Sequence, residues 1–269
     1  MKDNLKIAKT LIEALPYIQK FRGKTVVLKF GGSIGSKEFA NFSRDLVLMK
    51  FVGINPVVVH GGGIEITKAL SSSNIKATFV NGLRVTCDKT MEIVEKVLVG
   101  KVNKQIVSKI KSNGGVSIGL SGRDHQLLKV KKVKTPKKGI DLGRVGEIIK
   151  VNVSHIFELQ NKGYIPVIAP IGLNSKGIAY NINGDYAASK IASSLNAEKL
   201  IILTDVEGIK DKNNNLISSI SKKRANLLIK SGVIASGMVP KEKCMIDALT
   251  EGVKKAHIID GRIPHSLVL

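Results

Sequence analysis

The hydrophobic positions follow two periods that take turns along the chain. Unbroken aliphatic and β-branched runs predict buried strands at 25–29, 56–60, 116–120, 165–169, 200–204 and 256–259. Apolar residues spaced three or four apart predict helices at about 39–49, from 64 onward, and at 89–112, 185–195, 221–231 and 241–251. Because strands and helices alternate, we expect an α/β fold, a three-layer αβα sandwich with a mainly parallel central sheet.

Two segments depart from this alternation. Residues 6–19 predict an amphipathic helix ahead of the first strand, which either packs on its own domain or meets a partner subunit. Residues 127–151 are basic and are interrupted by proline and glycine, which indicates an antiparallel flap at the edge of the first lobe. The chain is therefore predicted to comprise an N-terminal helix (1–23), an N-lobe (24–175) and a C-lobe (176–269).

Composition is that of a globular protein with a sizeable core. The chain has 269 residues, of which 43% are apolar, and a mean hydropathy of +0.09. No apolar run reaches the roughly 18 to 20 residues of a membrane span, and we expect no secretion signal. Cys87 and Cys244 have no paired spacing, which excludes a cysteine metal cluster and favours a reducing, cytoplasmic compartment.

The net charge of +22 raises the question of nucleic-acid binding. The lysines are spread along the whole chain, and only 129–138 forms a dense basic run. Aromatic residues make up 4% of the chain and there is no tryptophan, so stacking platforms for bases are scarce. A lysine-rich surface that attracts anionic substrates is the preferred interpretation.

Two glycine clusters lie where a predicted strand gives way to a helix, at 29–32 (KFGG) and 60–63 (HGGG). Glycine lets backbone N–H groups approach a phosphate, and the N-terminus of the following helix favours an anion. Lys29 can neutralise charge on a transferring phosphoryl group, whereas His60 is interpreted as a hydrogen-bonded structural residue. The pattern predicts a phosphate site at the carboxyl edge of the sheet.

Two further segments, in the second half of the chain, contain residues that suit the same phosphate site, at 181–185 (NINGD) and 236–241 (SGMVPK). Asn181, Asn183 and Asp185 alternate, so they project to one side of an extended segment. Asp185 is expected to cap the helix that follows and also to orient two lysines, Lys29 and Lys241.

Two polar turns complete the candidate site. Arg84, in a GLRVT turn, has a planar guanidinium that can hold a carboxylate by two parallel bonds. The polar turn at 204–208 (TDVEG) ends another predicted strand and suits contact with a purine or ribose. The P-loop, protein-kinase and dinucleotide fingerprints are all missing, so a different phosphate-binding solution is required.

Taken in order, these segments resemble the amino acid kinase family, and within it the members that phosphorylate N-acetyl-L-glutamate in arginine biosynthesis. The resemblance runs nearly from end to end, and eight segments carry it: VVLKFGGS, VVVHGGG, FVNGLRVT, VLVGKVNK, YNINGDYAA, LTDVEGI, SGMVPKEK and HIIDGRIPHSL. It implies transfer of the ATP γ-phosphoryl group to the side-chain carboxylate of N-acetyl-L-glutamate, which gives an acyl phosphate. The implied fold is that of the amino acid and carbamate kinases, with acetylglutamate bound by the N-lobe and ATP by the C-lobe.

The resemblance also assigns roles to individual residues. Lys29 and Lys241 would stabilise the transition state, and Asp185 would organise them. The remaining expected roles are substrate binding by Gly62, Gly63, Arg84 and Asn181, phosphate binding by Gly31 and Gly32, and nucleotide binding by Asp205, Gly208, Gly237 and Met238. No metal site in the protein is expected, because Mg²⁺ would be carried by ATP.

Expected partners follow from the same resemblance. The N-terminal helix is similar to one that interlaces dimers into hexamers, so a homodimer or homohexamer is expected, with a PII-type regulator as a further possible partner. Members that arginine inhibits normally continue past the HSL segment, whereas this sequence stops at Leu269, so the resemblance does not extend to feedback by arginine. The location would be cytoplasmic, or the plastid stroma for an organelle-encoded protein, with no membrane partner.

Two alternatives stay open at this stage. A sibling kinase that phosphorylates carrier-bound aminoadipate or glutamate in lysine or arginine biosynthesis has a segment similar to 119–122 (GLSG). A non-catalytic nucleic-acid-binding or regulatory protein on the same scaffold is the other, although both lysines and Asp185 are retained. Turnover with a carrier-bound acceptor but not with free N-acetyl-L-glutamate would favour the first alternative. Absence of turnover with either acceptor would favour the second.

Overall fold

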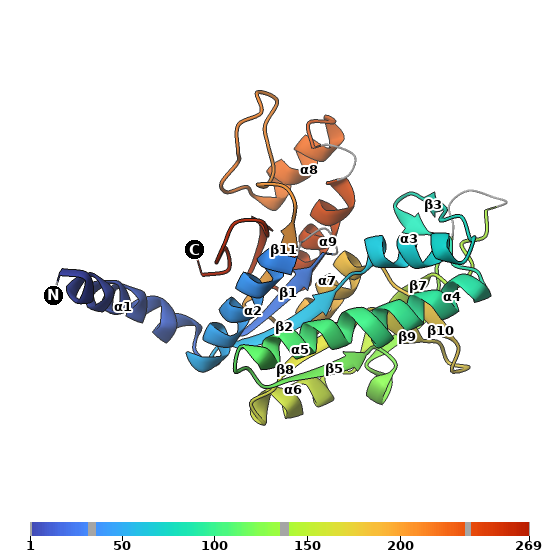
Figure 1. The fold of residues 1–269 in the computed structure, drawn as a ribbon. Helices are drawn as coiled ribbons and strands as arrows, with labels where there is room; N and C mark the ends of the chain where they lie inside the picture. The colour runs from blue at the N-terminus through green and yellow to red at the C-terminus, as the bar shows by residue number, and fades with distance from the viewer. Residues whose placement is uncertain (1, 32–35, 135–139, 235–237, 269) are drawn as a thin grey trace.

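The computed structural model describes residues 2–31, 36–134, 140–234 and 238–268. Its centre is a six-stranded sheet in the order β12-β11-β1-β2-β8-β5, in which every neighbouring pair is parallel (Figure 1). These strands are β1 (Thr25–Phe30), β2 (Asn55–His60), β5 (Ser117–Ser121), β8 (Ile165–Ala169), β11 (Lys199–Thr204) and β12 (Lys255–Asp260). All six predicted strands are therefore confirmed, with ends shifted by a residue or so.

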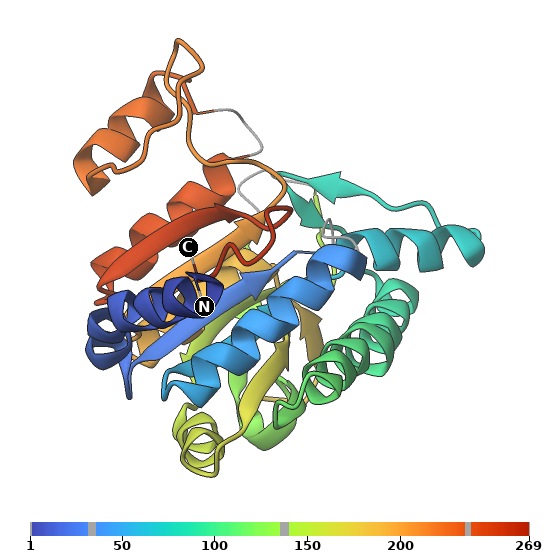
Figure 2. The same cartoon turned by 60° about the vertical axis from the view of Figure 1, so that its left-hand side comes forward.

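Helices cover both faces of this sheet, as the alternating pattern predicted (Figures 1 and 2). The α-helices of the described residues are α1 (Lys2–Phe21), α2 (Ser36–Phe51), α3 (Gly63–Ser72), α4 (Asp88–Glu95), α5 (Lys104–Ser112), α6 (Ser154–Asn161), α7 (Gly184–Ser194), α8 (Lys222–Lys230) and α9 (Val239–Thr250). Buried residues of α6, α7 and α9 form one core with one face of the sheet. Those of α2 and α5 form a second core with the other face. The three-layer αβα sandwich is thus confirmed.

A second, four-stranded sheet lies beside the central one, in the order β10-β9-β6-β7. Its strands are β6 (Leu128–Lys132), β7 (Gly146–Val151), β9 (Ile171–Leu173) and β10 (Ala179–Asn181), and β3 (Phe79–Val80) pairs separately with β4 (Leu83–Arg84). The antiparallel pairing of β6 with β7 confirms the predicted flap. The sequence pattern missed β9 and α6, because each is too short to show a period. The predicted lobe boundary lies in the turn between β9 and β10, and the division into lobes stays a prediction.

The long helix predicted at 89–112 is interrupted by a π-helical segment, η1 (Lys96–Asn103), between α4 and α5. This wider helix turns the buried Asn103 toward the sheet, where its amide donates to the carbonyls of Leu120 (3.3 Å) and Val167 (2.9 Å). Gly119 makes room for it, since a Cβ there would lie 2.0 Å from Asn103 Oδ1. Such π segments often occur at functional sites.

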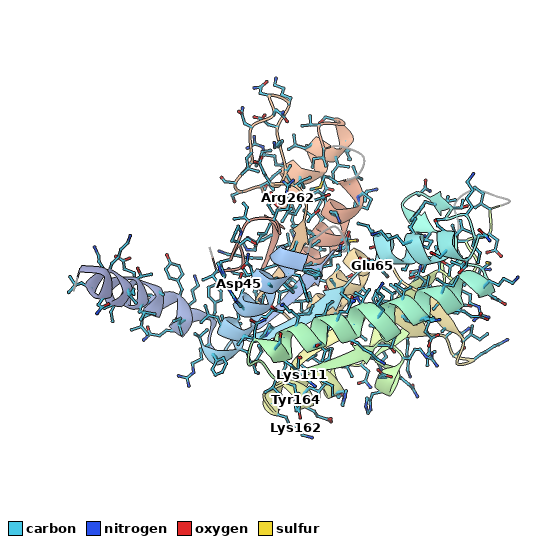
Figure 3. All side chains as sticks on the ribbon, in the orientation of Figure 1. Asp45, Glu65, Lys111, Lys162, Tyr164 and Arg262 are labelled. Atoms are coloured by element: carbon cyan, nitrogen blue, oxygen red, sulfur yellow. The ribbon has the colours of Figure 1, made fainter. Side chains whose placement is uncertain are left out.

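Helix α1 extends away from the rest of the molecule, and its side chains project into open space along most of its length (Figures 1 and 3). Its apolar residues are largely exposed, for example Leu11 at 64% and Ile12 at 69%. None of the helices in the described part of the chain combines the length and apolarity needed to cross a membrane.

The fit between η1 and β5 can be tested with two glycine-to-alanine changes. Gly119→Ala should lower the free energy of unfolding by about 1–3 kcal/mol, because the new methyl group overlaps Asn103. Gly100→Ala is the matched control: its Cβ meets nothing within 4 Å, so it should be neutral or stabilise by up to about 1 kcal/mol. Urea unfolding measures both, and equal effects of the two changes would contradict the packing described here.

Candidate functional site

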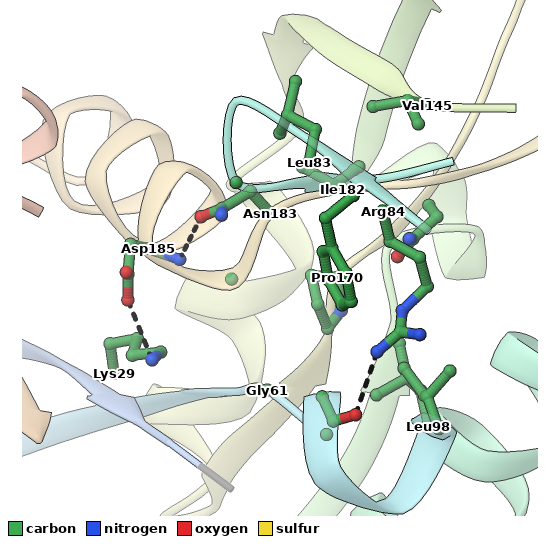
Figure 4. A pocket seen from close by; sticks show the side chains of 17 residues that line it. Lys29, Gly61, Leu83, Arg84, Leu98, Val145, Pro170, Ile182, Asn183 and Asp185 are labelled. Atoms are coloured by element: carbon green, nitrogen blue, oxygen red, sulfur yellow. Dashed lines mark hydrogen bonds and ion pairs between the residues drawn. The ribbon is translucent and has the colours of Figure 1, made fainter. Parts of the chain in front are cut away.

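The carboxyl ends of β1 and β2 face the N-terminus of α7 across a cavity of about 210 Å³ (Figure 4). Residues from both halves of the chain line this cavity. Those predicted from the sequence are Lys29, Gly62, Gly63, Arg84, Asn181 and Asp185. Segments far apart in the sequence therefore meet at one edge of the sheet, where open α/β sheets bind ligands.

Asp185 lies between the two predicted lysines. Lys29 Nζ is 2.8 Å from Asp185 Oδ1, and Lys241 Nζ donates to Oδ2 at 2.8 Å. Lys29 and Asp185 are each 8% exposed, so this arrangement is shielded from water. One carboxylate thus holds two ammonium groups that come from β1 and α9 and leaves a net positive charge.

Burial and mutual attraction act in opposite directions on these groups. Burial lowers the pKa of Lys29, and the Asp185 carboxylate offsets this only in part. Burial also acts to raise the pKa of Asp185, but the charges of Lys29 and Lys241 outweigh it and keep the pKa below its usual range. Asp185 is therefore ionised at neutral pH and can hold both lysines in place.

The cap of α7 differs from the sequence prediction. Asn183, not Asp185, is the N-cap, and its Oδ1 accepts the backbone N–H groups of Asp185 (2.9 Å) and Tyr186 (3.1 Å). Asparagine just before a helix is a strong cap signal, which identifies Asn183 from the sequence in retrospect. Because Asn183 satisfies the helix end, the Asp185 carboxylate is free to bind the lysines.

The glycine loop after β2 is held close to the rest of the site. The Gly61 N–H donates to the carbonyl of Phe30 (2.8 Å), which joins the ends of β2 and β1. Gly62 is the N-cap of α3, and a Cβ on it would lie 2.6 Å from Leu98 Cδ2. Leu98 is 1% exposed and has little room to move, so the loop needs glycine here.

Arg84, on β4, reaches the other side of the cavity. Its Nη2 donates to the Gly63 carbonyl and to Thr67 Oγ1, both at 2.9 Å, and its guanidinium lies 4.5 Å from the centre of the Phe79 ring. Burial lowers the pKa of Arg84, although a guanidinium stays charged. Its Nη1 is buried without a partner among the described residues, which leaves a donor free for a ligand.

Asn181, at the end of β10, lines the same cavity as Arg84, and its Nδ2 donates to Thr86 Oγ1 at 3.3 Å. The sequence did not single out Thr67, Phe79 or Leu98 as site residues. Each acts through a contact with a residue distant in the sequence, so no local pattern indicates it.

Of the predicted nucleotide residues, the three that the structure describes, Asp205, Gly208 and Met238, do not line this cavity. Asp205 directly follows β11, and Met238 is the N-cap of α9. Gly208, with a left-handed φ of 145°, lines a separate cavity of about 430 Å³ bordered by α9 and β12. Gly31 is buried just after β1, whereas Gly32 and Gly237 lie outside the described residues. Within the described chain, no group of three or more His, Cys, Asp or Glu side chains could hold a metal ion.

The site thus presents two ammonium groups on one side and a guanidinium with an unused donor on the other. Backbone amides at the N-terminus of α3 lie between them. Such a site suits a ligand with two anionic ends, one of which carries or receives a phosphoryl group.

Comparison with known proteins agrees with this geometry. Acetylglutamate kinase of Caldanaerobacter subterraneus subsp. tengcongensis is 54% identical, and the match covers 99% of this chain and 90% of the relative. Acetylglutamate kinase of Aquifex aeolicus is 50% identical over 100% of this chain and 95% of the relative.

Solved structures share the fold. N-acetylglutamate synthase from Neisseria gonorrhoeae, in complex with coenzyme A and N-acetyl-glutamate, aligns with a TM-score of 0.87 and 25% identity over 97% of this chain, which spans 60% of the synthase chain. Carbamate kinase from Giardia aligns with a TM-score of 0.64 and 16% identity, over 91% of this chain and 96% of the kinase. The family model for the amino acid kinase family matches residues 24–260. The chain belongs to the amino acid kinase family.

Proposed function

We propose that this protein transfers the γ-phosphoryl group of ATP to the side-chain carboxylate of N-acetyl-L-glutamate, a step of arginine biosynthesis. The two ammonium groups held by one buried carboxylate, Lys29–Asp185–Lys241, are the observation that carries this proposal. The names of relatives that are about half identical over nearly the whole chain support the choice of acceptor. Because these relatives act on free acetylglutamate by name, neither a carrier-bound acceptor nor a nucleic-acid-binding role is favoured.

The proposed chemistry needs no general base. A γ-carboxylate with an ordinary pKa of about 4.3 is already ionised at neutral pH. One of its oxygens forms a bond to the γ-phosphorus while the bond to the β,γ-bridging oxygen breaks, and ADP leaves with those electrons. Lys29 and Lys241 neutralise the charge that gathers on the transferring group, and Asp185 keeps both lysines directed at it.

The nucleotide would be held on the C-lobe side of the cavity. We assign phosphate contacts to Gly31 and Gly32, and nucleotide contacts to Asp205, Gly208, Gly237 and Met238. The cavity walls are cationic rather than acidic, so they fit a metal that arrives on the ATP phosphates, where Mg²⁺ would neutralise phosphate charge. The protein residues would then orient the ATP phosphates and supply the remaining positive charge.

The acceptor would lie on the N-lobe side. Arg84 would bind the α-carboxylate of acetylglutamate, and its Nη1, which has no partner among the described residues, supports this role. Asn181 can bond the acetamide or carboxylate across the same cavity, and the backbone amides of Gly62 and Gly63 would bind the reacting end of the substrate, where the phosphoryl group arrives. Each of these groups contacts a different end of the substrate, which would favour the acetylated amino acid over shorter acids.

We further propose that the protein works in the cytoplasm as a homodimer or homohexamer, with α1 as part of the contact between subunits. The exposed apolar residues of α1 would be covered in such an assembly. A PII-type regulator stays a prediction of the sequence.

Removal of either lysine should abolish most turnover. Lys29→Ala and Lys241→Ala should each lower kcat for N-acetyl-L-glutamate on the order of 100-fold or more, because each removes a positive charge from the transition state. Hydroxamate formation from the acyl phosphate measures this.

Lys24→Ala and Lys243→Ala, which change exposed lysines near the same elements, serve as controls and should keep wild-type kcat. A thermal unfolding curve for each variant separates lost chemistry from lost fold. Full turnover in a folded Lys29 or Lys241 variant would remove that lysine from the mechanism.

Arg84 should act on acceptor binding rather than on ATP. Arg84→Lys keeps a positive charge but loses the planar pair of donors, so KM for N-acetyl-L-glutamate should rise about tenfold or more while KM for ATP stays near wild type. Steady-state kinetics with each substrate varied in turn gives both constants. Arg144→Lys, at a half-exposed arginine that pairs with Asp88, is the matched control. An equal rise in both KM values would contradict the assignment.

Charge placed on the apolar stripe of α1 should reduce the size of the assembly. Leu11→Glu combined with Leu15→Glu introduces two charges that a buried interface cannot solvate. Sedimentation velocity should then show a smaller particle than wild type at equal protein concentration. Lys9→Gln, on the polar face of the same helix, should leave the particle unchanged. An identical particle for all three proteins would exclude α1 from the interface.

A further inference from the structure

A buried chain of hydrogen bonds connects the glycine loop of the candidate site to the π-helical segment η1. His60 is 0% exposed, and its Nδ1 lies 2.9 Å from the carbonyl oxygen of Gly61. Its Nε2 lies 3.1 Å from Nδ2 of Asn103, the last residue of η1. None of the roles proposed above uses this pair.

The partners determine how the ring is protonated. A carbonyl oxygen only accepts, so His60 Nδ1 must carry the proton that it donates to Gly61. An amide nitrogen only donates, so Nε2 must accept from Asn103 Nδ2. The two N–H groups of Nδ2 face three acceptors, His60 Nε2 and the carbonyls of Leu120 and Val167, so one N–H is shared between two of them. Only the neutral ring with its proton on Nδ1 satisfies both contacts, and burial lowers the pKa of His60 to about 4, which keeps the ring neutral near pH 7.

The direction of the next amide follows from the planarity of the peptide. In a trans peptide the carbonyl oxygen and the following N–H point in opposite directions. Because His60 holds the Gly61 oxygen on the side of the core, the Gly62 N–H is directed away from the core. Gly62 lines the cavity, and its N–H has no partner among the described residues.

We infer that His60 and Asn103 are positioning residues that hold the Gly61–Gly62 peptide so that the Gly62 N–H donates to the phosphoryl group during its transfer. This inference rests on the proposed function for the identity of the ligand. Leu98, also on η1, packs against Gly62 from the other side, so the same helical segment restrains the loop at two points. His60 itself touches no substrate and exchanges no proton.

Two substitutions of His60, one that removes the contacts of both ring nitrogens and one that keeps a donor near Nδ1, test whether His60 contributes to turnover. His60→Leu removes both contacts and should lower kcat about 100-fold, with KM for ATP unchanged, since the lost donor acts mainly in the transition state. His60→Asn places an amide N–H near the position of Nδ1, so it should restore kcat to within about tenfold of wild type. Equal loss in the two variants, or full kcat in His60→Leu, would overturn the inference.

Gln160→Leu is the matched control for lost stability. Gln160 is a buried amide that bonds Thr25 at the opposite end of β1, so its loss should lower the melting temperature without lowering kcat below that temperature. A double-mutant cycle adds Asn103→Leu to His60→Leu. The paired variant should lose little more kcat than the worse single variant, whereas fully additive losses would contradict a shared role.

A second measurement decides the inference even if the protein phosphorylates something other than acetylglutamate. In ¹⁵N-labelled protein without substrate, the Gly62 amide should have an order parameter near the rigid value of about 0.85 in wild type and in Gln160→Leu, and a lower one in His60→Leu. A Gly62 amide that stays equally rigid in His60→Leu would refute the positioning role. Absence of wild-type turnover with acetylglutamate would instead refute the proposed function alone.

Discussion

The arrangement of the site depends on one electrostatic constraint: two lysine ammonium groups must stay close together in a poorly solvated place. Like charges repel strongly there, and burial alone already acts against the charged form of Lys29. The Asp185 carboxylate offsets both the repulsion between the lysines and the cost of burial, because one of its oxygens pairs with each lysine. Removing one partner from such a group leaves an uncompensated charge, so the three residues act as a unit.

This constraint explains why the fold brings these elements together. Lys29 comes from the end of β1, Asp185 from the first turn of α7 and Lys241 from the first turn of α9. α7 and α9 both pack on the same face of the sheet, where their buried residues share one core. The packed core therefore sets the separation of the charges, and the helix cap by Asn183 leaves the Asp185 side chain free for its two partners.

Much of this fold was predictable because its signals are local. The six strands are unbroken apolar runs, and the glycine clusters at 29–32 and 60–63 mark in the sequence where two of these runs end. The position of Lys29 beside the 60–63 glycines also followed from strand ends that share an edge, whereas Asp185 and Arg84 were grouped with them through their chemistry and the family resemblance. The capping role given to Asp185 was wrong, since Asn183 and Asp185, two residues apart, compete for the same helix end and only geometry decides between them.

Other features could not be derived because they depend on contacts between distant residues. The spacing of hydrophobic residues gives no sign that Asn103 bonds the carbonyls of Leu120 and Val167, or that Gly119 leaves space for this side chain. The short strand β9 and helix α6 are likewise defined by what they pack against. The nucleotide residues Asp205, Gly208 and Met238 stay predictions.

The π-helical segment η1 also limits how the chain can change in length. A hydrogen bond in a π-helix spans five residues and one in an α-helix spans four, so deleting one residue from 96–103 would restore regular helix and remove the wider turns. Leu98 and Asn103 would then face different neighbours, and Gly62 and His60 would lose their supports together. The wider turns of η1 therefore fix the length of this helix, because the glycine loop of the candidate site depends on where Leu98 and Asn103 lie along it.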